Sequence, residues 1–331
     1  MRTLTKEQIV IHITKMSCKF LGSLNFAFTL FLLFFVGNRS VLSDFETKSY
    51  DWSTAKELRT GILHAKIERT SPQKMVINCL RIDSHTPGMK LYTTPRCSNW
   101  LAEQSETIRQ TTRDFIRQSQ KTDQKLVVAI NASPFSPWPA PYQKEEPTDI
   151  SGFAVSQGIV VSKQKNVASL LASKAGSLQI SMVSTELDIS NVETAVSGFS
   201  LCLTNGEPSS SGTQLHPRTG IGLSKDGQYL FFLTIDGRQT NSYGATVSGV
   251  GSLLKTFGAY NGINMDGGGS TTMAWWDPSI SSSDKCRLLN RPVGNGDDYR
   301  DEKSLPDFVP TERANGNNLG VYFVDVEKVN H

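Results

Sequence analysis

Three short segments of the chain hold side chains suited to chemistry on an anionic substrate. They read His216-Pro217-Arg218-Thr219-Gly220, then Asp236-Gly237-Arg238, then Asn264-Met265-Asp266-Gly267-Gly268-Gly269-Ser270. Arg218 and Arg238 each offer a planar fork of N–H donors, which suits bidentate binding of phosphate. Asp236 and Asp266 offer carboxylates for general-base or electrostatic work. We therefore expect the three segments to meet in one cleft.

The glycine run after Asp266 predicts an anion site made by the backbone. Gly267, Gly268 and Gly269 follow a short apolar run, and Ser270 comes next. Consecutive glycines let several backbone N–H groups point at one place, and such a nest binds an anionic oxygen. The alternatives are a flexible turn or a calcium-binding loop, although three ordered glycines carry a cost in conformational entropy.

The other two segments also have simpler interpretations. Asp236-Gly237 is a common tight-turn pair. Arg218 could take part in a structural ion pair instead of binding substrate.

The chain lacks the usual signatures of several enzyme classes. It contains no G-x-S-x-G elbow, no H-E-x-x-H pair and no P-loop. Its five histidines are too few to indicate a histidine-rich metal centre. The net charge of +3 is too small to predict a nucleic-acid or membrane-surface partner. Catalysis therefore falls to carboxylates, arginines, asparagines and backbone amides.

The N-terminus is typical of an exported protein. Residues 21–36 are uncharged and rich in Phe and Leu, two lysines precede them, and small residues come just before Asp44. This pattern predicts a signal peptide at 1–43, with Met16 as an alternative start. Export would deliver the chain to the extracellular space, the periplasm or the lumen of the secretory pathway. An uncleaved anchor is the alternative, but the apolar run is shorter than the roughly 20 residues of a membrane-spanning helix.

Four cysteines follow the predicted signal, at Cys79, Cys97, Cys202 and Cys286. An even number in an exported chain predicts at least one disulfide, and two can form. Buried free thiols are the alternative. None of the four has the C-x-x-C spacing of a structural zinc site.

Short apolar runs bounded by turn residues dominate the rest of the chain. They predict strands at 75–82, 126–130, 178–183, 263–265 and 319–326, and hairpins at 153–161 and 221–235. Helices are expected at 100–120 and at 246–257, the second with Thr246 as N-cap and Gly258 after its end. Residues 44–70 are polar and are expected to be a lead-in. We predict an α+β fold, with a strand-rich mixed or antiparallel sheet and a few packed helices, in a single domain at 71–331.

Taken in order, these segments resemble the phosphodiester glycosidase family. The resemblance covers roughly residues 74–326. It runs through Val128 to Phe135, His216 to Gly222, Asp236 to Arg238, Asn264 to Met273, Asn290-Arg291-Pro292 and Glu312-Arg313. A proline-rich loop at 134–147 and an insertion at 293–311 differ from compact members of the family. These two segments bear on substrate size, not on the core chemistry.

The resemblance implies a hydrolase that cuts between the anomeric carbon of a sugar and phosphate. This is an activity of phosphodiester α-N-acetylglucosaminidase type, belonging to carbohydrate metabolism. A phosphate monoester is a better leaving group than a sugar alcohol, so strong general-acid help is less necessary. The implied partner is a glycosyl phosphodiester or phosphorylated glycan, with no nucleic acid and no stable membrane span after signal cleavage. The scheme requires no cofactor or metal, and it leaves open a cation at Asp266.

The implied site contains three catalytic residues and a larger set that binds substrate. The catalytic residues are Asp266, Asp236 and Arg218, and either carboxylate could act on water or on the oxocarbenium-like centre. Asn131 is expected to hold a sugar hydroxyl or acetamido group. The remaining substrate-binding residues are Arg238, Thr219, Gly267, Gly268, Gly269, Ser270, Asn290 and Arg313.

Two other functions would use the same residues. The first is a non-catalytic module that binds anionic cell-surface polysaccharide. The second is a glycosidase that acts on acidic glycans. Release of a phosphate monoester from a model sugar-1-phosphodiester separates the predicted activity from both.

Overall fold

The computed structural model describes residues 49–137, 142–163, 166–295 and 310–325. In these residues the fold is rich in strands, and every pair of named strands is antiparallel. The strand-rich fold predicted from the sequence is therefore confirmed, and of the mixed or antiparallel sheet that was expected, the named strands form the antiparallel kind. The described residues contain two α-helices, α2 and α3, so helix makes a smaller share than the α+β expectation implied.

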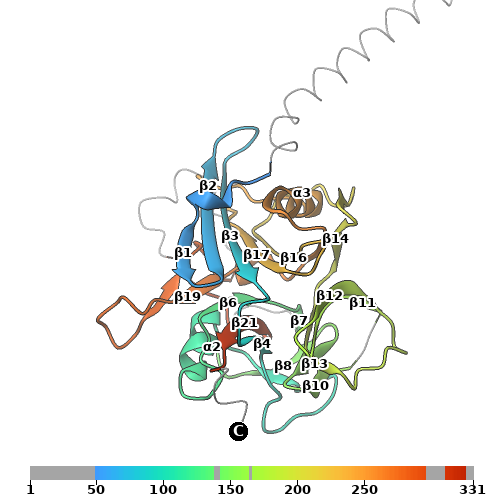
Figure 1. Cartoon of the computed structure of the whole chain (residues 1–331). Coiled ribbons are helices and arrows are strands. Elements are labelled where there is room, and N and C mark those ends of the chain that lie inside the picture. Colours follow the sequence, from blue (N-terminus) through green and yellow to red (C-terminus); the bar gives the residue numbers. More distant parts are fainter. Residues whose placement is uncertain (1–48, 138–141, 164–165, 296–309, 326–331) are drawn as a thin grey trace, which may run out of the picture. The chain divides into compact units, whose positions relative to one another are not determined.

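The largest sheet has eight strands and forms the upper half of the view in Figure 1. In spatial order its strands are β1 (Lys56–Arg59), β2 (Ile62–Arg69), β3 (Met75–Asp83), β17 (Tyr229–Ile235), β16 (Arg218–Leu223), β18 (Asn261–Asn264), β14 (Ser200–Thr204) and β15 (Glu207–Pro208). The predicted hairpin at 221–235 is confirmed as the antiparallel pair β16 and β17. Gly227 in its turn has a φ of 76°, which glycine adopts at no steric cost.

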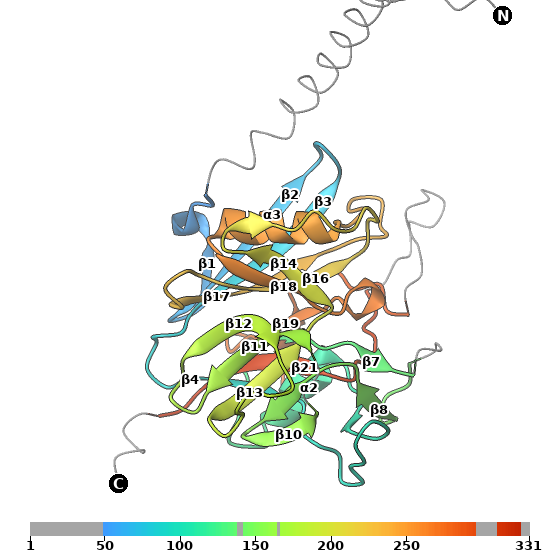
Figure 2. The same ribbon diagram turned by 90° about the vertical axis from the view of Figure 1, so that its right-hand side faces the viewer.

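Helix α3 (Val247–Phe257) covers one face of this sheet (Figure 2). Its predicted N-cap is confirmed, because the Thr246 side chain accepts a hydrogen bond of 3.0 Å from the N–H of Gly249. Gly258 ends the helix with a φ of 108°. A Cβ on Gly251 would collide with the carbonyl of Cys202 on β14, so this glycine lets the helix lie directly on the sheet.

Two five-stranded sheets lie against the other face of the large sheet. The first contains β10 (Ile159–Ser162), β9 (Ala154–Ser156), β13 (Val192–Ser197), β11 (Val167–Ser173) and β12 (Leu178–Val183). The second contains β20 (Cys286–Leu288), β19 (Met273–Trp276), β6 (Val128–Asn131), β21 (Asn318–Phe323) and β4 (Met89–Thr93). Residues such as Leu80, Ile130, Leu170 and Ile221 share one buried core, which joins all three sheets.

The predicted helix at 100–120 is correct only in its second half. Helix α2 is Thr112–Ser119, and Thr111 caps it by accepting a hydrogen bond of 3.1 Å from the N–H of Asp114. The residues before it form β5 (Thr107–Ile108), which belongs to a small sheet with β8 (Pro147–Ile150) and β7 (Phe135–Ser136). Pairing with β8 and the cap at Thr111 together prevent an earlier helix start.

The segment 44–70 was expected to be a polar lead-in. Its described residues, from 49 onward, include β1 and β2 of the large sheet. β2 pairs with β3 along its whole length, from Ile62 with Ile82 to Arg69 with Met75. Its polar residues alternate with buried ones such as Ala65, because one face of the strand is exposed to solvent. The folded part of the chain therefore begins before residue 71.

The expected disulfide is absent, and the free-thiol alternative is correct for the described structure. Cys79, Cys97, Cys202 and Cys286 are all free. Cys79 and Cys202 are fully buried in the apolar core beneath α3, where each sulfur packs as a small hydrophobic group.

The predicted signal peptide at 1–43 lies outside the described residues. Within the residues that are described, no helix has the length and apolar character needed to cross a membrane.

Candidate active site

The ends of three neighbouring strands bring the predicted segments to one edge of the eight-stranded sheet. Strand β16 lies between β17 and β18. Its first residue, Arg218, pairs with Ile235 at the end of β17, and two residues later β16 pairs with Asn264 at the end of β18. Asp236 follows Ile235 directly, and Asp266 comes two residues after Asn264. The register of the sheet thus gathers the arginine and both carboxylates at one edge, as the sequence predicts.

Asp266 is a buried carboxylate, with 2% of its surface exposed. Its Oδ1 accepts a hydrogen bond of 2.9 Å from the N–H of Gly267, whereas its Oδ2 is buried and accepts none among the described residues. Burial raises the pKa of Asp266 to about 6, although the nearby Ser270 hydroxyl and the charge of Arg313 act against this rise. The group is therefore mainly ionised at neutral pH, and its Oδ2 keeps unused capacity to accept a hydrogen bond.

Asn131 holds Asp266 in place from the neighbouring sheet. Its Nδ2 donates to the carbonyl oxygen of Asp266 at 2.7 Å, and its Oδ1 accepts from the Thr219 hydroxyl at 2.7 Å and from the N–H of Thr272 at 3.1 Å. Asn131 and Thr219 are both fully buried. Both were expected to bind substrate, and the structure shows their side chains bonded to one another and to the segment that carries Asp266.

Two of the three glycines after Asp266 lie against an arginine guanidinium. A Cβ built on Gly268 would lie 3.5 Å from Nη2 of Arg238, and one built on Gly269 would lie 2.5 Å from Nη2 of Arg313 and would collide with the carbonyl oxygen of Gly294. A Cβ on Gly267 would meet the carbonyl oxygen of Pro217 at 2.8 Å and Cα of Arg218 at 3.7 Å. The absence of side chains therefore lets Arg238 and Arg313 approach the turn closely.

Arg238 repels both Arg218 and Arg313 electrostatically. Arg218 donates to the carbonyls of Ala245 at 3.0 Å and Gln214 at 3.1 Å, neither of which neutralises its charge. Burial lowers the pKa of Arg218, and the charge of Arg238 lowers it further. Burial also lowers the pKa of Arg313, where Asp266 opposes the shift and Arg238 adds to it. A bound anion would relieve this repulsion, so the cluster is suited to phosphate.

Several N–H groups of the glycine turn, predicted to form an anion nest, already bond within the protein. The N–H of Gly267 donates to Asp266, and that of Gly268 donates to the carbonyl of Pro217 at 2.8 Å. The N–H of Ser270 donates to Gly267 at 3.2 Å, and the Ser270 hydroxyl accepts from Nη1 of Arg313 at 3.2 Å. Because these three N–H groups are used, the guanidinium groups are the donors best placed to contact an anion.

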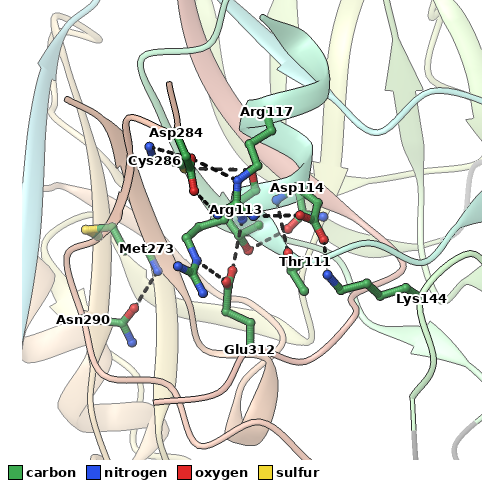
Figure 3. A network of polar contacts seen from close by, with 12 residues as sticks. Thr111, Arg113, Asp114, Arg117, Lys144, Met273, Asp284, Cys286, Asn290 and Glu312 are labelled. Atoms are coloured by element: carbon green, nitrogen blue, oxygen red, sulfur yellow. Dashed lines mark hydrogen bonds and ion pairs between the residues drawn. The ribbon is translucent and has the colours of Figure 1, made fainter. Parts of the chain in front are cut away.

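Asp236 lies in a different environment from Asp266. Its Oδ1 accepts hydrogen bonds of 3.0 Å from Nδ2 of Asn290 and 3.0 Å from the N–H of Arg291. Burial raises the pKa of Asp236 to about 7 in spite of these donors. Asn290 also donates to the carbonyl of Thr271 and accepts from the N–H of Met273, a bond drawn in Figure 3. These hydrogen bonds hold residues 290–291 next to Asp236 and to the end of the glycine turn.

Helix α2 supports the segment that carries Arg313. The side chain of Glu312 is 3% exposed, and it accepts from both the backbone N–H and Nε of Arg113 in the first turn of α2 (Figure 3). A carboxylate at a helix N-terminus is also favoured by the helix dipole. The ring of Tyr142 lies over the guanidinium of Arg313, with the ring centroid 4.4 Å from Cζ. Sequence reasoning missed Arg113 and Tyr142, since neither lies in a segment with a recognisable spacing.

The surroundings of Asp266 are a poor match for a metal ion. No group of three or more His, Cys, Asp or Glu side chains that could hold a metal occurs in the part of the chain that the structure describes. The positive charge of Arg313 acts directly on Asp266, and it would repel a cation there.

Comparison with known proteins identifies the fold and the family. The family model described as phosphodiester glycosidase matches residues 124–321, a stretch that includes β6, the arginine cluster and both carboxylates. No curated protein matches the chain.

Several solved structures are similar to the chain. One is the catalytic domain of zebrafish N-acetylglucosamine-1-phosphodiester alpha-N-acetylglucosaminidase, auto-inhibited by its pro-peptide, with a TM-score of 0.55, 19% identity, and coverage of 82% of this chain and 87% of that one. A hypothetical protein from Synechocystis has a TM-score of 0.51 and 14% identity, covering 80% and 62%. A putative exported protein from Burkholderia pseudomallei has a TM-score of 0.50 and 13% identity, covering 75% and 74%. These identities show a shared fold.

Proposed function

The chain belongs to the phosphodiester glycosidase family, and we propose that it hydrolyses the bond between a sugar's anomeric carbon and phosphate in a glycosyl-1-phosphodiester. The observation that carries this proposal is the turn after Asp266, where the guanidinium groups of Arg238 and Arg313 lie beside Gly268 and Gly269 and the charge of Arg238 also acts on Arg218. A carboxylate beside a cluster of guanidinium groups supplies both charges that the reaction needs. The arginines stabilise the anionic leaving group, and the carboxylate of Asp266 stabilises the cationic sugar centre.

Arg218, Arg238 and Arg313 bind the phosphate in this scheme. Their N–H groups stabilise the negative charge that gathers on the phosphate oxygens as the bond from the anomeric carbon to oxygen breaks. A phosphate monoester has a second pKa of about 6, so it can leave without a proton from the enzyme. The scheme therefore requires no strong general acid.

Asp266 acts at the anomeric carbon. Its backbone is fixed by Asn131, and its Oδ2 accepts no hydrogen bond within the described residues. The ionised carboxylate either removes a proton from the attacking water or faces the oxocarbenium-like centre. The oxygen of water forms the new bond to carbon, and the products are a free sugar and a phosphate monoester. We assign Asp236 a positioning role, because its Oδ1 already accepts two hydrogen bonds.

The test is hydrolysis of the methyl diester of N-acetylglucosamine-α-1-phosphate in water enriched in ¹⁸O. Cleavage at the anomeric carbon places the label in the sugar, whereas attack at phosphorus places it in the phosphate product. Label in the sugar supports the proposal, and label in the phosphate would make the protein a phosphodiesterase of another kind. Binding without release of any phosphate monoester would favour a non-catalytic polysaccharide-binding module.

We also propose that the chain is exported, on the evidence of the apolar run at 21–36. N-terminal sequencing of protein secreted by expressing cells should find a start near Asp44. Soluble cytoplasmic protein that retains Met1 or Met16 would contradict export.

We further propose that one domain carries the activity and that it begins before residue 71. The support is that β1 and β2 complete the eight-stranded sheet. A chain starting at Ser49 should be folded and active. A chain starting at residue 71 would expose the edge of β3 and should aggregate.

A further inference from the structure

A cavity of about 590 Å³ opens beside α2, outside the arginine cluster around Asp266. Its lining includes Tyr92, Arg96, Gln110, Phe115 and Lys121. Tyr92 and Phe115 form a stacked pair with ring centroids 5.4 Å apart. The volume lies within the range of about 300 to 1,000 Å³ that is usual for pockets binding small molecules. The reaction proposed above does not use this cavity.

One acceptor atom in the lining, the Oε1 of Gln110, is buried without a hydrogen-bond partner. The whole residue is 9% exposed. Its backbone N–H and carbonyl both bond to Asn315, so the residue itself is firmly held. A buried amide without a partner costs free energy, and native proteins rarely retain one unless a bound group satisfies it. A ligand hydroxyl or N–H group can supply the missing donor here.

The cavity is positively charged. Its lining contains the carboxylates of Asp114 and Glu145 and five cationic side chains, from Arg96, Arg109, Arg117, Lys121 and Lys144. Figure 3 shows that Asp114 pairs with both Arg117 and Lys144. Arg109 pairs with Glu146.

Two of the cations are not neutralised by carboxylates. Among the described residues no ion pair includes Arg96 or Lys121. Arg96 is held by a hydrogen bond to the carbonyl of Val160 and by stacking on Trp100, with Cζ 3.6 Å from the ring centroid. The cavity therefore offers two cations for an anionic group beside polar groups for hydroxyls.

A single aromatic ring links the cavity to the active site. The centroid of the Tyr142 ring lies 4.4 Å from Cζ of Arg313, in the catalytic cluster, and 5.6 Å from Cζ of Arg109, in the cavity lining. Tyr142 therefore lies between an arginine of the cluster around Asp266 and an arginine of the cavity lining.

We propose that the cavity is a subsite for the next sugar phosphate unit of the substrate, so that the enzyme acts on glycans whose successive sugars are joined by phosphodiesters. The inference rests on the proposed function. The scissile phosphate lies at Arg218, Arg238 and Arg313, and the sugar on its leaving side passes Tyr142. Arg96 and Lys121 bind the following phosphate, and a hydroxyl of the next sugar donates a hydrogen bond to Gln110.

The test compares two substrates and a double variant. The probes are the methyl diester of N-acetylglucosamine-α-1-phosphate and a trimer of the same sugar joined by 1→6 phosphodiesters. The variant combines Arg96→Gln with Lys121→Gln, and both residues are exposed enough for the fold to tolerate the change. The KM for the trimer should rise about tenfold, while kcat/KM for the methyl diester stays unchanged. Lys125→Gln is the matched control, because it removes an exposed charge from the same loop outside the lining.

An equal effect of the double variant on both substrates, or no effect on either, would overturn the subsite. A second readout separates this outcome from failure of the proposed reaction. Calorimetry would measure binding of the trimer's uncleavable phosphonate analogue to the wild type and to the double variant. If the wild type cleaves neither diester but binds the analogue at least about tenfold more tightly than the variant, the subsite stands and the reaction does not. Equal binding by both proteins refutes the subsite whether or not cleavage occurs.

Discussion

The side-chain amide of Asn131 donates a hydrogen bond of 2.7 Å to the carbonyl oxygen of Asp266. Asn131 ends β6 in a five-stranded sheet, whereas Asp266 follows β18 of the eight-stranded sheet. A second bond joins the same two segments, from the N–H of Asp266 to the carbonyl of Ala132 at 3.1 Å. The carboxylate is thus fixed where two sheets meet, and its position depends on how those sheets pack.

Asn131→Asp should reduce turnover by displacing Asp266. The substitution keeps the size of the side chain, but it replaces the donor to Asp266 with an oxygen that repels the carbonyl. We expect a fall of about tenfold or more in kcat, and a loss of about 1 to 3 kcal/mol in the free energy of unfolding, because a buried acceptor is left unsatisfied. Steady-state kinetics and urea denaturation measure the two effects.

Thr219→Val is the matched control for that change. It removes the hydrogen bond from the Thr219 hydroxyl to Asn131 but leaves the bond from Asn131 to Asp266 in place. Its effect on kcat should be clearly smaller than that of the aspartate variant. If the two variants lose the same turnover, Asn131 does not act through Asp266.

Asp266→Asn should abolish most activity while the fold remains intact. The change keeps the side-chain size and removes the negative charge that faces the sugar. We expect kcat to fall by at least roughly a hundredfold, with an unchanged circular dichroism spectrum. Asp236→Asn should have a smaller effect, because its Oδ1 can still accept from Asn290 and Arg291. An active Asp266→Asn protein beside an inactive Asp236→Asn protein would exchange the two roles.

The predictions from sequence succeeded where the pattern is local. The turn at Asp226-Gly227 requires a positive φ, which glycine provides, and this pair of residues therefore indicated the hairpin of β16 and β17. The Thr246 cap and Gly258 likewise marked both ends of α3. The arginines and carboxylates met at one edge because each flanks a strand whose limits were visible in the apolar pattern.

The sequence could not show contacts between distant parts of the chain. Asn131 and Asn290 were expected to bind substrate, and no spacing rule indicates that their amides also bond to partners far away in the sequence. The same holds for the N–H groups of Gly267 and Gly268, which bond to Asp266 and to the carbonyl of Pro217. The strand β2 has a polar sequence because one of its faces is exposed to solvent, so it was mistaken for a lead-in.

Arg218→Lys should weaken both binding and turnover. Arg218 presents a fork of donors whose Nε and one Nη are held by the carbonyls of Ala245 and Gln214. Lysine cannot keep both of these bonds and also contact a phosphate. We expect kcat/KM for a sugar phosphodiester to fall by about tenfold to a hundredfold, while the melting temperature changes little. Unchanged kinetics in this variant would exclude Arg218 from the phosphate site.

The activity should fall in acid because Asp266 must be ionised. Burial raises the pKa of this group to about 6 in the empty site, and kcat/KM reports the ionisation of the free enzyme. We therefore expect kcat/KM to decline below about pH 6, by close to tenfold for each pH unit. The residual activity of Asp266→Asn should lack this acid limb. The same limb in the variant would assign it to another group.

The stability of the fold should fall as the pH rises, because Asp236 is buried. Its folded pKa is about 7, whereas an unfolded aspartate titrates near about 3.9. Between these values the folded chain keeps a proton that the unfolded chain has released. The free energy of unfolding therefore decreases with rising pH, by up to about 1.4 kcal/mol per pH unit from this group. Asp266 contributes in the same direction up to about pH 6.

Asp236→Asn removes this titration while it keeps the acceptor for Asn290 and Arg291. Urea denaturation between about pH 4.5 and pH 7.5 should therefore show a weaker pH dependence in the variant than in the wild type, most clearly between about pH 5 and pH 6.5, where wild-type Asp236 keeps its proton in the folded chain alone. Asp188→Asn serves as the control at an exposed site, where hydrogen bonds from Ser190 lower the pKa of the carboxyl. This control should retain the decline seen in the wild type. A variant Asp236→Asn curve parallel to that of the wild type would show that Asp236 is already ionised in the folded chain at low pH.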